Sequence, residues 1–471
     1  MNVQISSGTL AGTRDERGIC AWLGIPYAAP PVGELRFAAP QPPPAWTGER
    51  DATQYGKAAM QLSSATPVAE PMVQRLGTSE DCLTLNVWSP AADGAKRPVL
   101  VWIHGGAFMM GTAATYSGAE LAALGDLVVV TVNYRLGPLG FVAFPGAATN
   151  CGLRDQLAAL AWVQENIAAF GGDPDRVTVA GESAGSVAVS LHLISPNARG
   201  LFRAAIAQSG SISLVATAER GRELASLYTA ALGDDLRAVP AQRFVDVHMQ
   251  IMMANLGTVT TRPVLDGDVL PATPEALFAA PHAPVPLLSG SNKDEATLFA
   301  LLRLLPTEHA TLAQLLETRV APDLARRVLA EYAADRAGGL ELARDALFAM
   351  PMIHFAEQHP APAFHYRFDW PTPAFGGSLG AMHALEVFLM WLDIERPRAQ
   401  ALLGGPPSAE VRALALRMKR HWIAFVRDLD PGWPPYSPTR SVKIFDLIDH
   451  VERDPEASRR AAWAGLDGVE Q

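Results

Sequence analysis

Short, continuously apolar segments alternate with a longer segment of helical periodicity in the first half of the chain. Three of the apolar segments, 99–103, 127–132 and 204–209, show little polar alternation, which is typical of strands covered on both faces. Between them, residues 153–170 repeat apolar side chains at helical spacing. Strands that alternate with helices predict a mostly parallel sheet with helices on both faces, so the expected fold class is α/β.

The second half of the chain has longer helical stretches between its apolar segments. Strands are expected at 285–290 and 363–368. The residues at about 211–281 and 295–358 are instead rich in Ala, Leu and Arg at helical spacing. We therefore predict a single catalytic domain over residues 1–471, with helical excursions in these two ranges.

Two N-terminal segments lack a clear period. Residues 22–37 are too rich in Pro and Gly for a helix and too apolar for a linker, so we expect an ordered loop over a core. Residues 61–77 shift to Ser, Ala, Thr and Pro, which predicts a surface loop. Between the 61–77 segment and the first covered strand, residues 81–88 alternate apolar and polar side chains, as a half-exposed strand does.

The charge balance argues against two classes of partner. The chain has 48 acidic and 38 basic side chains, a net charge of -10, and no polybasic run, which is unlike a nucleic-acid or anionic-membrane binder. Its longest aliphatic run, 127–130, is too short to span a bilayer. The N-terminus shows strand alternation in place of a basic start and an apolar run, so we expect no secretory signal.

The three cysteines, Cys20, Cys82 and Cys151, cannot all pair and form no Cys-x-x-Cys motif. Buried free thiols are expected, and they suit a reducing cytosol. We therefore expect a cytoplasmic protein.

The residues Gly181-Glu182-Ser183-Ala184-Gly185 follow an apolar strand and precede a helical pattern. This is the arrangement of a nucleophile elbow, in which two small residues allow a sharp turn that exposes the serine. A serine hydroxyl becomes a good nucleophile only when a base takes its proton. The motif alone is common, so its weight depends on the partners elsewhere in the chain.

Candidate partners follow predicted strands, as catalytic groups do in such sheets. His383 follows a strand through a glycine-rich loop and is the candidate base; the other histidines after the strand ending at Gly290 lie within or beside regular elements or near the terminus. Asp294 and Glu295 both follow that strand directly, and the residues alone do not choose between them as the acid. Asp266 is expected to form a turn.

The segment His104-Gly105-Gly106 is a candidate for stabilising the negative charge that develops on the attacked carbonyl oxygen. Two glycines after a covered strand let the backbone approach a ligand closely. The N–H groups of Gly105, Gly106 and Ala184 are therefore candidates for an oxyanion hole, while His104 itself is interpreted as structural.

These segments together resemble the type-B carboxylesterase (para-nitrobenzyl esterase) family of α/β-hydrolases. The similarity covers about residues 3–210, with weaker similarity at 290–299 and 380–386. It is carried by several motifs: Gly24-Ile25-Pro26-Tyr27-Ala28, Glu80-Asp81-Cys82-Leu83-Thr84-Leu85-Asn86, His104-Gly105-Gly106-Ala107-Phe108, Asn133-Tyr134-Arg135, Phe170-Gly171-Gly172-Asp173-Pro174, Gly181 to Gly185, and Gln208-Ser209-Gly210.

The resemblance implies an α/β-hydrolase fold with helical excursions framing an active-site gorge. It also implies the triad Ser183, Glu295 and His383, with Ser209 in a supporting position. In secreted relatives, the cysteine that corresponds to Cys82 pairs with a second cysteine upstream. Met60 lies at about the position of that second cysteine, so we do not expect the disulfide. Its absence is in line with a bacterial-type cytosolic enzyme. No choline site is expected.

The predicted function is that of a serine carboxylesterase that hydrolyses uncharged carboxylic esters through an acyl-serine intermediate. Carbamates, amides, lactones and thioesters use the same machinery and stay open, as does, more remotely, a non-catalytic neuroligin-like binding protein. Although His383 and Glu386 have a metal-like spacing, no metal and no cofactor are expected, and the oligomeric state stays open. Candidate apolar pocket residues are Phe108, Met109, Met110, Met252, Met253 and Phe299.

Overall fold

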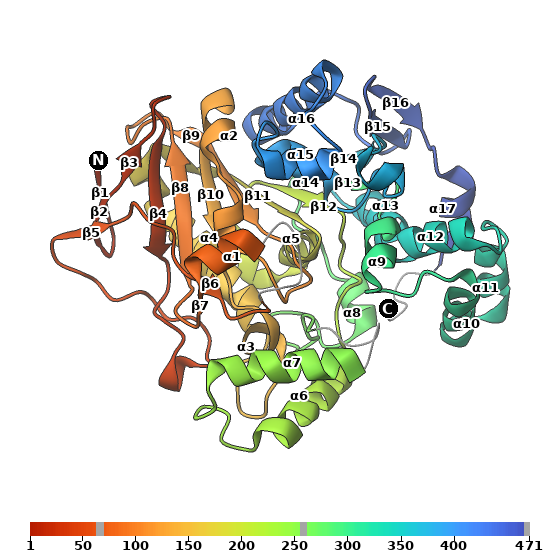
Figure 1. Cartoon of the computed structure of the whole chain (residues 1–471), viewed down its shortest axis with the longest axis horizontal. Coiled ribbons are helices and arrows are strands. Elements are labelled where there is room, and N and C mark those ends of the chain that lie inside the picture. Colours follow the sequence, from red (N-terminus) through yellow and green to blue (C-terminus); the bar gives the residue numbers. More distant parts are fainter. Residues whose placement is uncertain (63–69, 255–260, 466–471) are drawn as a thin grey trace. The chain divides into compact units, whose positions relative to one another are not determined.

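Residues 1–62, 70–254 and 261–465 are described by a computed structural model (Figure 1). Their internal contacts divide the chain into two units. Unit 1 comprises Met1–Ala205 and Val215–Ala280, and unit 2 comprises Ile206–Leu214 and Pro281–Gln471. The prediction of a single catalytic domain stays a prediction.

The main sheet of unit 1 contains the covered strands that the apolar segments predict. Its strand order is β11-β9-β10-β8-β4-β3. The central strands β9, β10 and β11 are parallel, whereas β8 is antiparallel to both β10 and β4. The bounds are β3 Thr13–Arg14, β4 Cys20–Pro26, β8 Thr84–Ser89, β9 Arg97–Ile103, β10 Val128–Val132 and β11 Gly172–Glu182. Every residue of β10 is buried, which explains why all but Thr131 are apolar.

Smaller sheets and helices complete unit 1. The smaller sheets have the orders β1-β2-β5 and β6-β7. Their strands are β1 Asn2–Ile5, β2 Gly8–Ala11, β5 Glu49–Asp51, β6 Ala58–Ala59 and β7 Thr78–Ser79. The α-helices are α1 Glu70–Leu76, α2 Ala119–Gly125, α3 Gly137–Phe141, α4 Cys151–Asn166, α5 Ala184–Ile194, α6 Ala218–Leu232, α7 Ala241–Ala254 and α8 Pro274–Phe278. The 3-10 helices are η1 Gly33–Leu35, η2 Ala113–Thr115, η3 Ile167–Phe170 and η4 Pro196–Ala198.

Unit 2 is also a sheet with helices. Its strands follow the order β16-β15-β14-β13-β12; β13, β14 and β15 are parallel, and β16 is antiparallel to β15. The strands are β12 Ala204–Gln208, which begins in unit 1, β13 Leu287–Asn292, β14 Ala363–Phe368, β15 Ser441–Phe445 and β16 His450–Arg453. The helices are α9 Ala296–Leu302, α10 His309–Arg319, α11 Pro322–Leu329, α12 Arg336–Arg344, α13 Met350–Gln358, α14 Leu385–Trp391, α15 Pro397–Leu403, α16 Ala409–Asp428 and α17 Ala457–Trp463. A π-helical turn, η5 Asp345–Ala349, and a 3-10 turn, η6 Ala374–Gly377, complete the unit.

Two N-terminal expectations are wrong in part. The first part of the 22–37 segment is strand β4, which pairs with β8 through a bulge between Trp22 and Ile25. Gly24 lies in that bulge with a φ of +65°. The glycine that suggested a loop therefore allows a bulge within a strand. In the 61–77 segment, residues 70–76 form helix α1, while residues 63–69 lie outside the described part of the chain.

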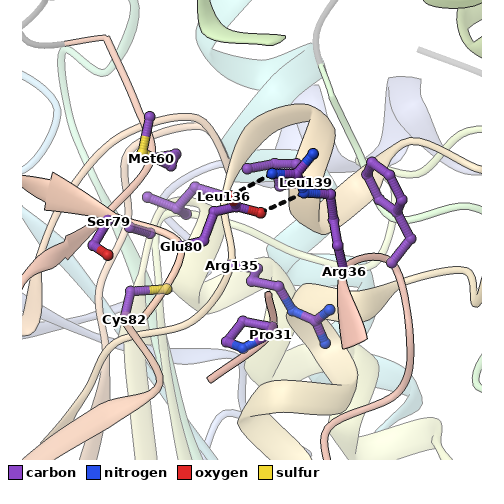
Figure 2. A pocket seen from close by; sticks show the side chains of 11 residues that line it. Pro31, Arg36, Met60, Ser79, Glu80, Cys82, Arg135, Leu136 and Leu139 are labelled. Carbon is purple, nitrogen blue, oxygen red and sulfur yellow. Dashed lines mark hydrogen bonds and ion pairs between the residues drawn. The ribbon is translucent and has the colours of Figure 1, made fainter. Parts of the chain in front are cut away.

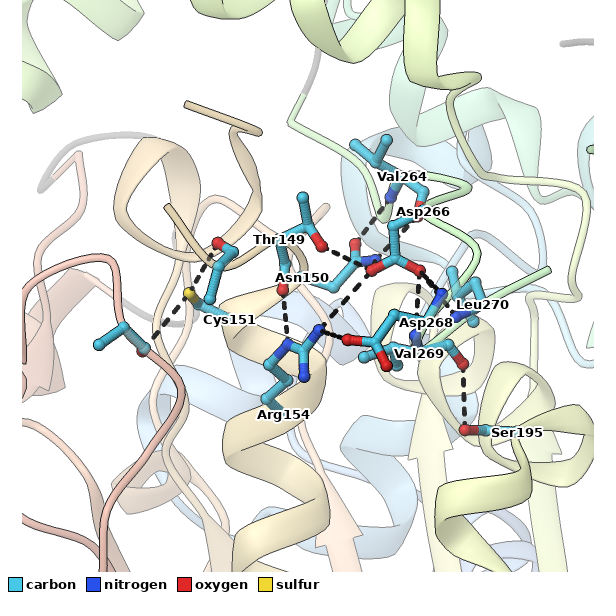
Figure 3. Close-up of polar contacts among 12 residues, drawn as sticks. Thr149, Asn150, Cys151, Arg154, Ser195, Val264, Asp266, Asp268, Val269 and Leu270 are labelled. Atoms are coloured by element: carbon cyan, nitrogen blue, oxygen red, sulfur yellow. Dashed lines mark hydrogen bonds and ion pairs between the residues drawn. The ribbon is translucent and has the colours of Figure 1, made fainter. Parts of the chain in front are cut away.

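The first helical excursion contains the helix pair α6 and α7 (Figure 1). Before the short helix α8, the excursion contains a turn at Asp266: one oxygen of this side chain accepts from the N–H groups of residues 268, 269 and 270, as its expected turn role requires. The other oxygen accepts from Thr149 Oγ1 at 2.6 Å and Asn150 Nδ2 at 2.8 Å (Figure 3). This network fixes the excursion to the start of α4.

A second anchor of the same excursion lies beside a small pocket. The guanidinium of Arg36 forms two 2.6 Å hydrogen bonds with the carboxylate of Glu80 (Figure 2). It also donates to the carbonyl oxygens of residues 236, 237 and 239, in the link between α6 and α7. Met60 and Cys82 line this pocket.

All three cysteines are free and buried, as expected. Burial raises the pKa of Cys82 well above its ordinary value, which keeps that thiol uncharged. Across the described residues, no helix combines the length and apolar character needed to cross a membrane.

Candidate active site

Ser183 lies between the end of β11 and the first residue of α5, with φ 55° and ψ -123°. This positive φ is strained for a serine. The flanking glycines make the turn possible: a Cβ on Gly181 would lie 2.5 Å from the carbonyl oxygen of Gly185, and one on Gly185 would lie 2.1 Å from the oxygen of Ile103. The half-buried Ser183 is therefore held in a conformation that larger neighbours would prevent.

The segment after β9, residues 104–111, is called the glycine loop below. A Cβ on Gly105 would lie 3.0 Å from Cβ of Ser183 and 2.7 Å from the carbonyl oxygen of Glu182, so this backbone packs directly against the elbow. Gly106 has a φ of +109°, and its Cβ would lie 2.1 Å from the carbonyl oxygen of Met110. Ala184 begins α5, where backbone N–H groups have no partner within the helix. The backbone donors predicted for an oxyanion hole thus belong to elements that meet at Ser183.

His104 has the contacts of a structural residue. Its Nδ1 lies 2.8 Å from the carbonyl oxygen of Gly105, and its own carbonyl accepts from the hydroxyl of Tyr134 at 2.7 Å. The two rings stack with centroids 4.6 Å apart. Burial lowers the pKa of His104 to about 4, so the imidazole is neutral near pH 7.

In unit 2, His383 and Glu295 form a hydrogen-bonded pair. Nδ1 of His383 lies 2.5 Å from Oε2 of Glu295. The other oxygen of Glu295 accepts from the backbone N–H of Asn292 at 2.7 Å, and the Glu295 side chain is fully buried. Both carboxylate oxygens are engaged, which fixes the orientation of the imidazole.

Asp294 contacts the backbone of the loop that carries His383. Its N–H donates to the carbonyl of Ala381 at 3.0 Å, and its Oδ2 accepts from the N–H of Ala381 at 2.8 Å. Gly380, with a φ of +58°, leaves room for this contact, since a Cβ there would lie 2.2 Å from the same oxygen. The structure thus separates the two neighbouring carboxylates: Glu295 bonds the imidazole and Asp294 bonds the loop.

Two phenyl rings flank the imidazole of His383. The ring of Phe299 lies 4.9 Å away and that of Phe348 lies 5.0 Å away, centroid to centroid. Phe348 belongs to the π-helical turn η5. Phe348 is not recognisable as a site residue from the sequence, because the periodicity around it fits an ordinary helix; π-helical turns have no comparable signature but are frequent at functional sites.

A second buried carboxylate, Glu386, lies near the pair. It accepts from the side-chain amides of Asn292 at 2.5 Å and Gln208 at 3.2 Å. Burial, together with the negative charge of Glu295, raises the pKa of Glu386 to about 7. The sequence singled out Glu386 only for its spacing from His383, and although Gln208 belongs to one of the family motifs, nothing in the sequence indicated that it or Asn292 would bind this carboxylate.

The remaining predicted residues take varied positions. Ser209 is buried with φ 56°, its N–H donates to Gly290, and among the described residues its hydroxyl has no hydrogen-bond partner. Phe108 and Met109 are buried, Met110 and Met252 are half-buried, and Met253 is 64% exposed. Whether these side chains and Phe299 line a substrate pocket stays a prediction.

The candidate site residues are divided between the units. Ser183 and the glycine loop belong to unit 1, and the Glu295–His383 pair belongs to unit 2. Within the described ranges, no group of three or more His, Cys, Asp or Glu side chains could hold a metal ion.

Comparison with known proteins identifies the family. The model of the carboxylesterase family matches residues 1–453. The chain is 38% identical to para-nitrobenzyl esterase of Bacillus subtilis over 96% of both chains, and 34% identical to acylcarnitine hydrolase of Mus musculus over 97% of this chain and 88% of that protein. A solved para-nitrobenzyl esterase structure superposes with a TM-score of 0.90 at 36% identity, covering 98% of this chain and 99% of the other.

These matches confirm the predicted α/β-hydrolase fold and the predicted family, and they give no support to a neuroligin-like binding protein. The chain belongs to the carboxylesterase family and is a carboxylic ester hydrolase.

Proposed function

We propose that the protein is a serine carboxylesterase in which Ser183 is the nucleophile, His383 the general base and Glu295 the acid that orients it. The observation that carries the proposal is the strained turn at Ser183 with Gly105 packed against it. Such a turn destabilises the folded state, and a serine with a purely structural role would not require it.

The proposed reaction has two halves. His383 takes the proton of the Ser183 hydroxyl through Nε2, because Nδ1 is bonded to Glu295. The serine oxygen attacks the ester carbonyl carbon, and the N–H groups of Gly105, Gly106 and Ala184 stabilise the negative oxygen. The C–O bond to the alcohol breaks, and His383 returns its proton to the leaving alkoxide. Water then attacks the acyl-serine by the same route and releases the acid.

Glu295 acts through its negative charge. It keeps the His383 proton on Nδ1, so that Nε2 is the nitrogen that accepts the serine proton, and it stabilises the imidazolium after proton transfer. Phe299 and Phe348 flank the ring, which favours proton transfer in an apolar environment. No cofactor is needed for this sequence of steps.

The proposed substrates are small, uncharged carboxylic esters. The predicted pocket side chains are apolar and rich in methionine, which adapts to different acyl groups. The net charge of -10 disfavours nucleic acid as a partner. We also propose a bacterial-type, cytoplasmic enzyme, since its cysteines are free and buried.

The test is the turnover of p-nitrophenyl esters of graded acyl length by the wild type and by Ser183→Ala. The wild type should release p-nitrophenol and be labelled stoichiometrically by an organophosphate, and the variant should do neither. Activity retained in Ser183→Ala would show that the nucleophile is another residue. A carbamate, an amide, a lactone and a thioester in the same panel would define which acyl bonds the site accepts.

A further inference from the structure

The glycine loop contains a second strained segment whose support comes from the helical excursion. Ala107 and Phe108, directly after the two glycines, have φ values of 54° and 58°. Two successive residues in the left-handed region persist only where the surroundings hold them. The loop therefore needs anchors outside its own backbone.

Phe108 supplies one anchor. Its side chain is fully buried, its ring lies 4.6 Å from that of Phe141, and its carbonyl accepts from the N–H of Gly137 at 2.7 Å. Met109 supplies the other end of the turn, because its N–H donates to the carbonyl of Gly106 at 2.9 Å. The carbonyl of Gly106 shares its peptide plane with the N–H of Ala107 and is joined to the N–H of Gly106 through the Cα of Gly106. A shift of Met109 thus moves this carbonyl and, through the Gly106 backbone, the N–H group that precedes it.

The side chain of Met109 is held by helix α7. Nε2 of His248 lies 3.0 Å from the sulfur of Met109, and Nδ1 of His248 lies 2.5 Å from the hydroxyl of Tyr228 on α6. A thioether sulfur only accepts, so Nε2 carries the proton and donates, and Nδ1 accepts from the tyrosine. Tyr228 therefore fixes the tautomer that holds Met109.

The other end of this chain of contacts is rigid. Tyr228 is fully buried in a cluster of apolar side chains that joins α6 and α7 to α3. The ring of Tyr228 also packs edge-on against Phe144 at 5.9 Å. Burial lowers the pKa of His248 to about 4, so one proton is present on the ring throughout the neutral range.

We propose that His248 is a positioning residue for the glycine loop: its Nε2–H group holds the sulfur of Met109 and so keeps the N–H groups of Gly105 and Gly106 in the arrangement that an oxyanion requires. This inference rests on the proposed function of those N–H groups. It gives the helical excursion a direct part in catalysis, distinct from any role in substrate choice.

The experiment compares His248→Phe, Met109→Leu and the double variant with the wild type. Each single change removes one partner of the N–H···S bond and keeps the approximate shape. Active sites are counted with an organophosphate, so that kcat refers only to folded enzyme, and affinity is measured for a trifluoromethyl ketone, whose adduct with serine carries an oxyanion. Both single variants should lose about fivefold in kcat and in trifluoromethyl ketone affinity, with KM within about twofold, since one hydrogen bond is lost. The double variant should be no worse than either single one.

The matched control is Val245→Ala, which removes a buried contact of α7 outside the cluster that holds Tyr228 and keeps the N–H···S bond. It should lower the melting temperature and leave kcat per active site unchanged. An equal loss of kcat in Val245→Ala, unchanged kcat in His248→Phe, or multiplying losses in the double variant would each overturn the inference. If His248→Phe does not fold, Met109→Leu alone decides by the same criteria, since that change conserves volume. An inactive wild type would instead overturn the proposed function itself.

Discussion

Nδ1 of His383 lies 2.5 Å from Oε2 of Glu295, while the adjacent Asp294 binds the backbone of Ala381. Two neighbouring carboxylates on one strand end thus have different partners. The difference arises because Glu295 directs one oxygen to the N–H of Asn292 and the other to the imidazole. It gives a direct way to test which carboxylate serves the reaction.

Glu295→Gln should lower kcat by about 10⁴, as the loss of the charge that orients and stabilises an imidazole does in other triads. Asp294→Asn is the matched control, because asparagine keeps an oxygen for the N–H of Ala381 and should stay within about tenfold of the wild type. Both are measured with a p-nitrophenyl ester per titrated active site. The reverse ranking would assign the acid role to Asp294.

Gly106→Ala should lower turnover by a hundredfold or more, roughly the effect of losing an oxyanion donor. The new Cβ would lie 2.1 Å from the carbonyl oxygen of Met110, so the glycine loop must move. Gly94→Ala is the control, since a Cβ there meets nothing within 4 Å. If Gly106→Ala kept full kcat, these N–H groups would not stabilise the oxyanion.

Glu386→Gln should make stability less dependent on pH. The folded protein raises the pKa of Glu386 from its ordinary value of 4.5 to about 7. The protonated form therefore stabilises the fold below pH 4.5, and this contribution is lost as the pH rises through 7. Denaturant unfolding at pH 5 and pH 8.5 gives the free energy of unfolding of both proteins. Relative to the wild type, the variant should be more stable at pH 8.5 than at pH 5. The exposed Glu223→Gln should show no such change, and parallel behaviour of the two variants would contradict the assignment.

Arg36→Met should lower the free energy of unfolding by about 3 kcal/mol, because it leaves the carboxylate of Glu80 unpaired in a mostly buried site. It also removes the donor to three carbonyls in the link between α6 and α7. The exposed ion pair of Arg17 with Asp15 provides the control, and Arg17→Met should cost less than about 1 kcal/mol. Equal losses in urea unfolding would mean that Arg36 does not anchor the excursion.

The apolar patterns predicted the central strands because burial on both faces dictates a local composition. β10 lies where a nearly continuous run of apolar residues predicts a strand covered on both faces. The same local logic located the elbow, since the turn at Ser183 requires glycine on both sides. Strand β4 was not predicted, because the residues around its bulge at Gly24 have the composition of a loop.

Most strands and helices, the family and the candidate residues at strand ends follow from the amino-acid sequence alone, since each depends on neighbours along the chain. Which side chains meet depends on the folded arrangement. The contacts of Glu386 with Gln208 and of His248 with Met109 join residues 178 and 139 positions apart. A hydrogen bond depends on distance and direction in space and leaves no periodic signature, so folding had to bring these partners together before their roles became visible.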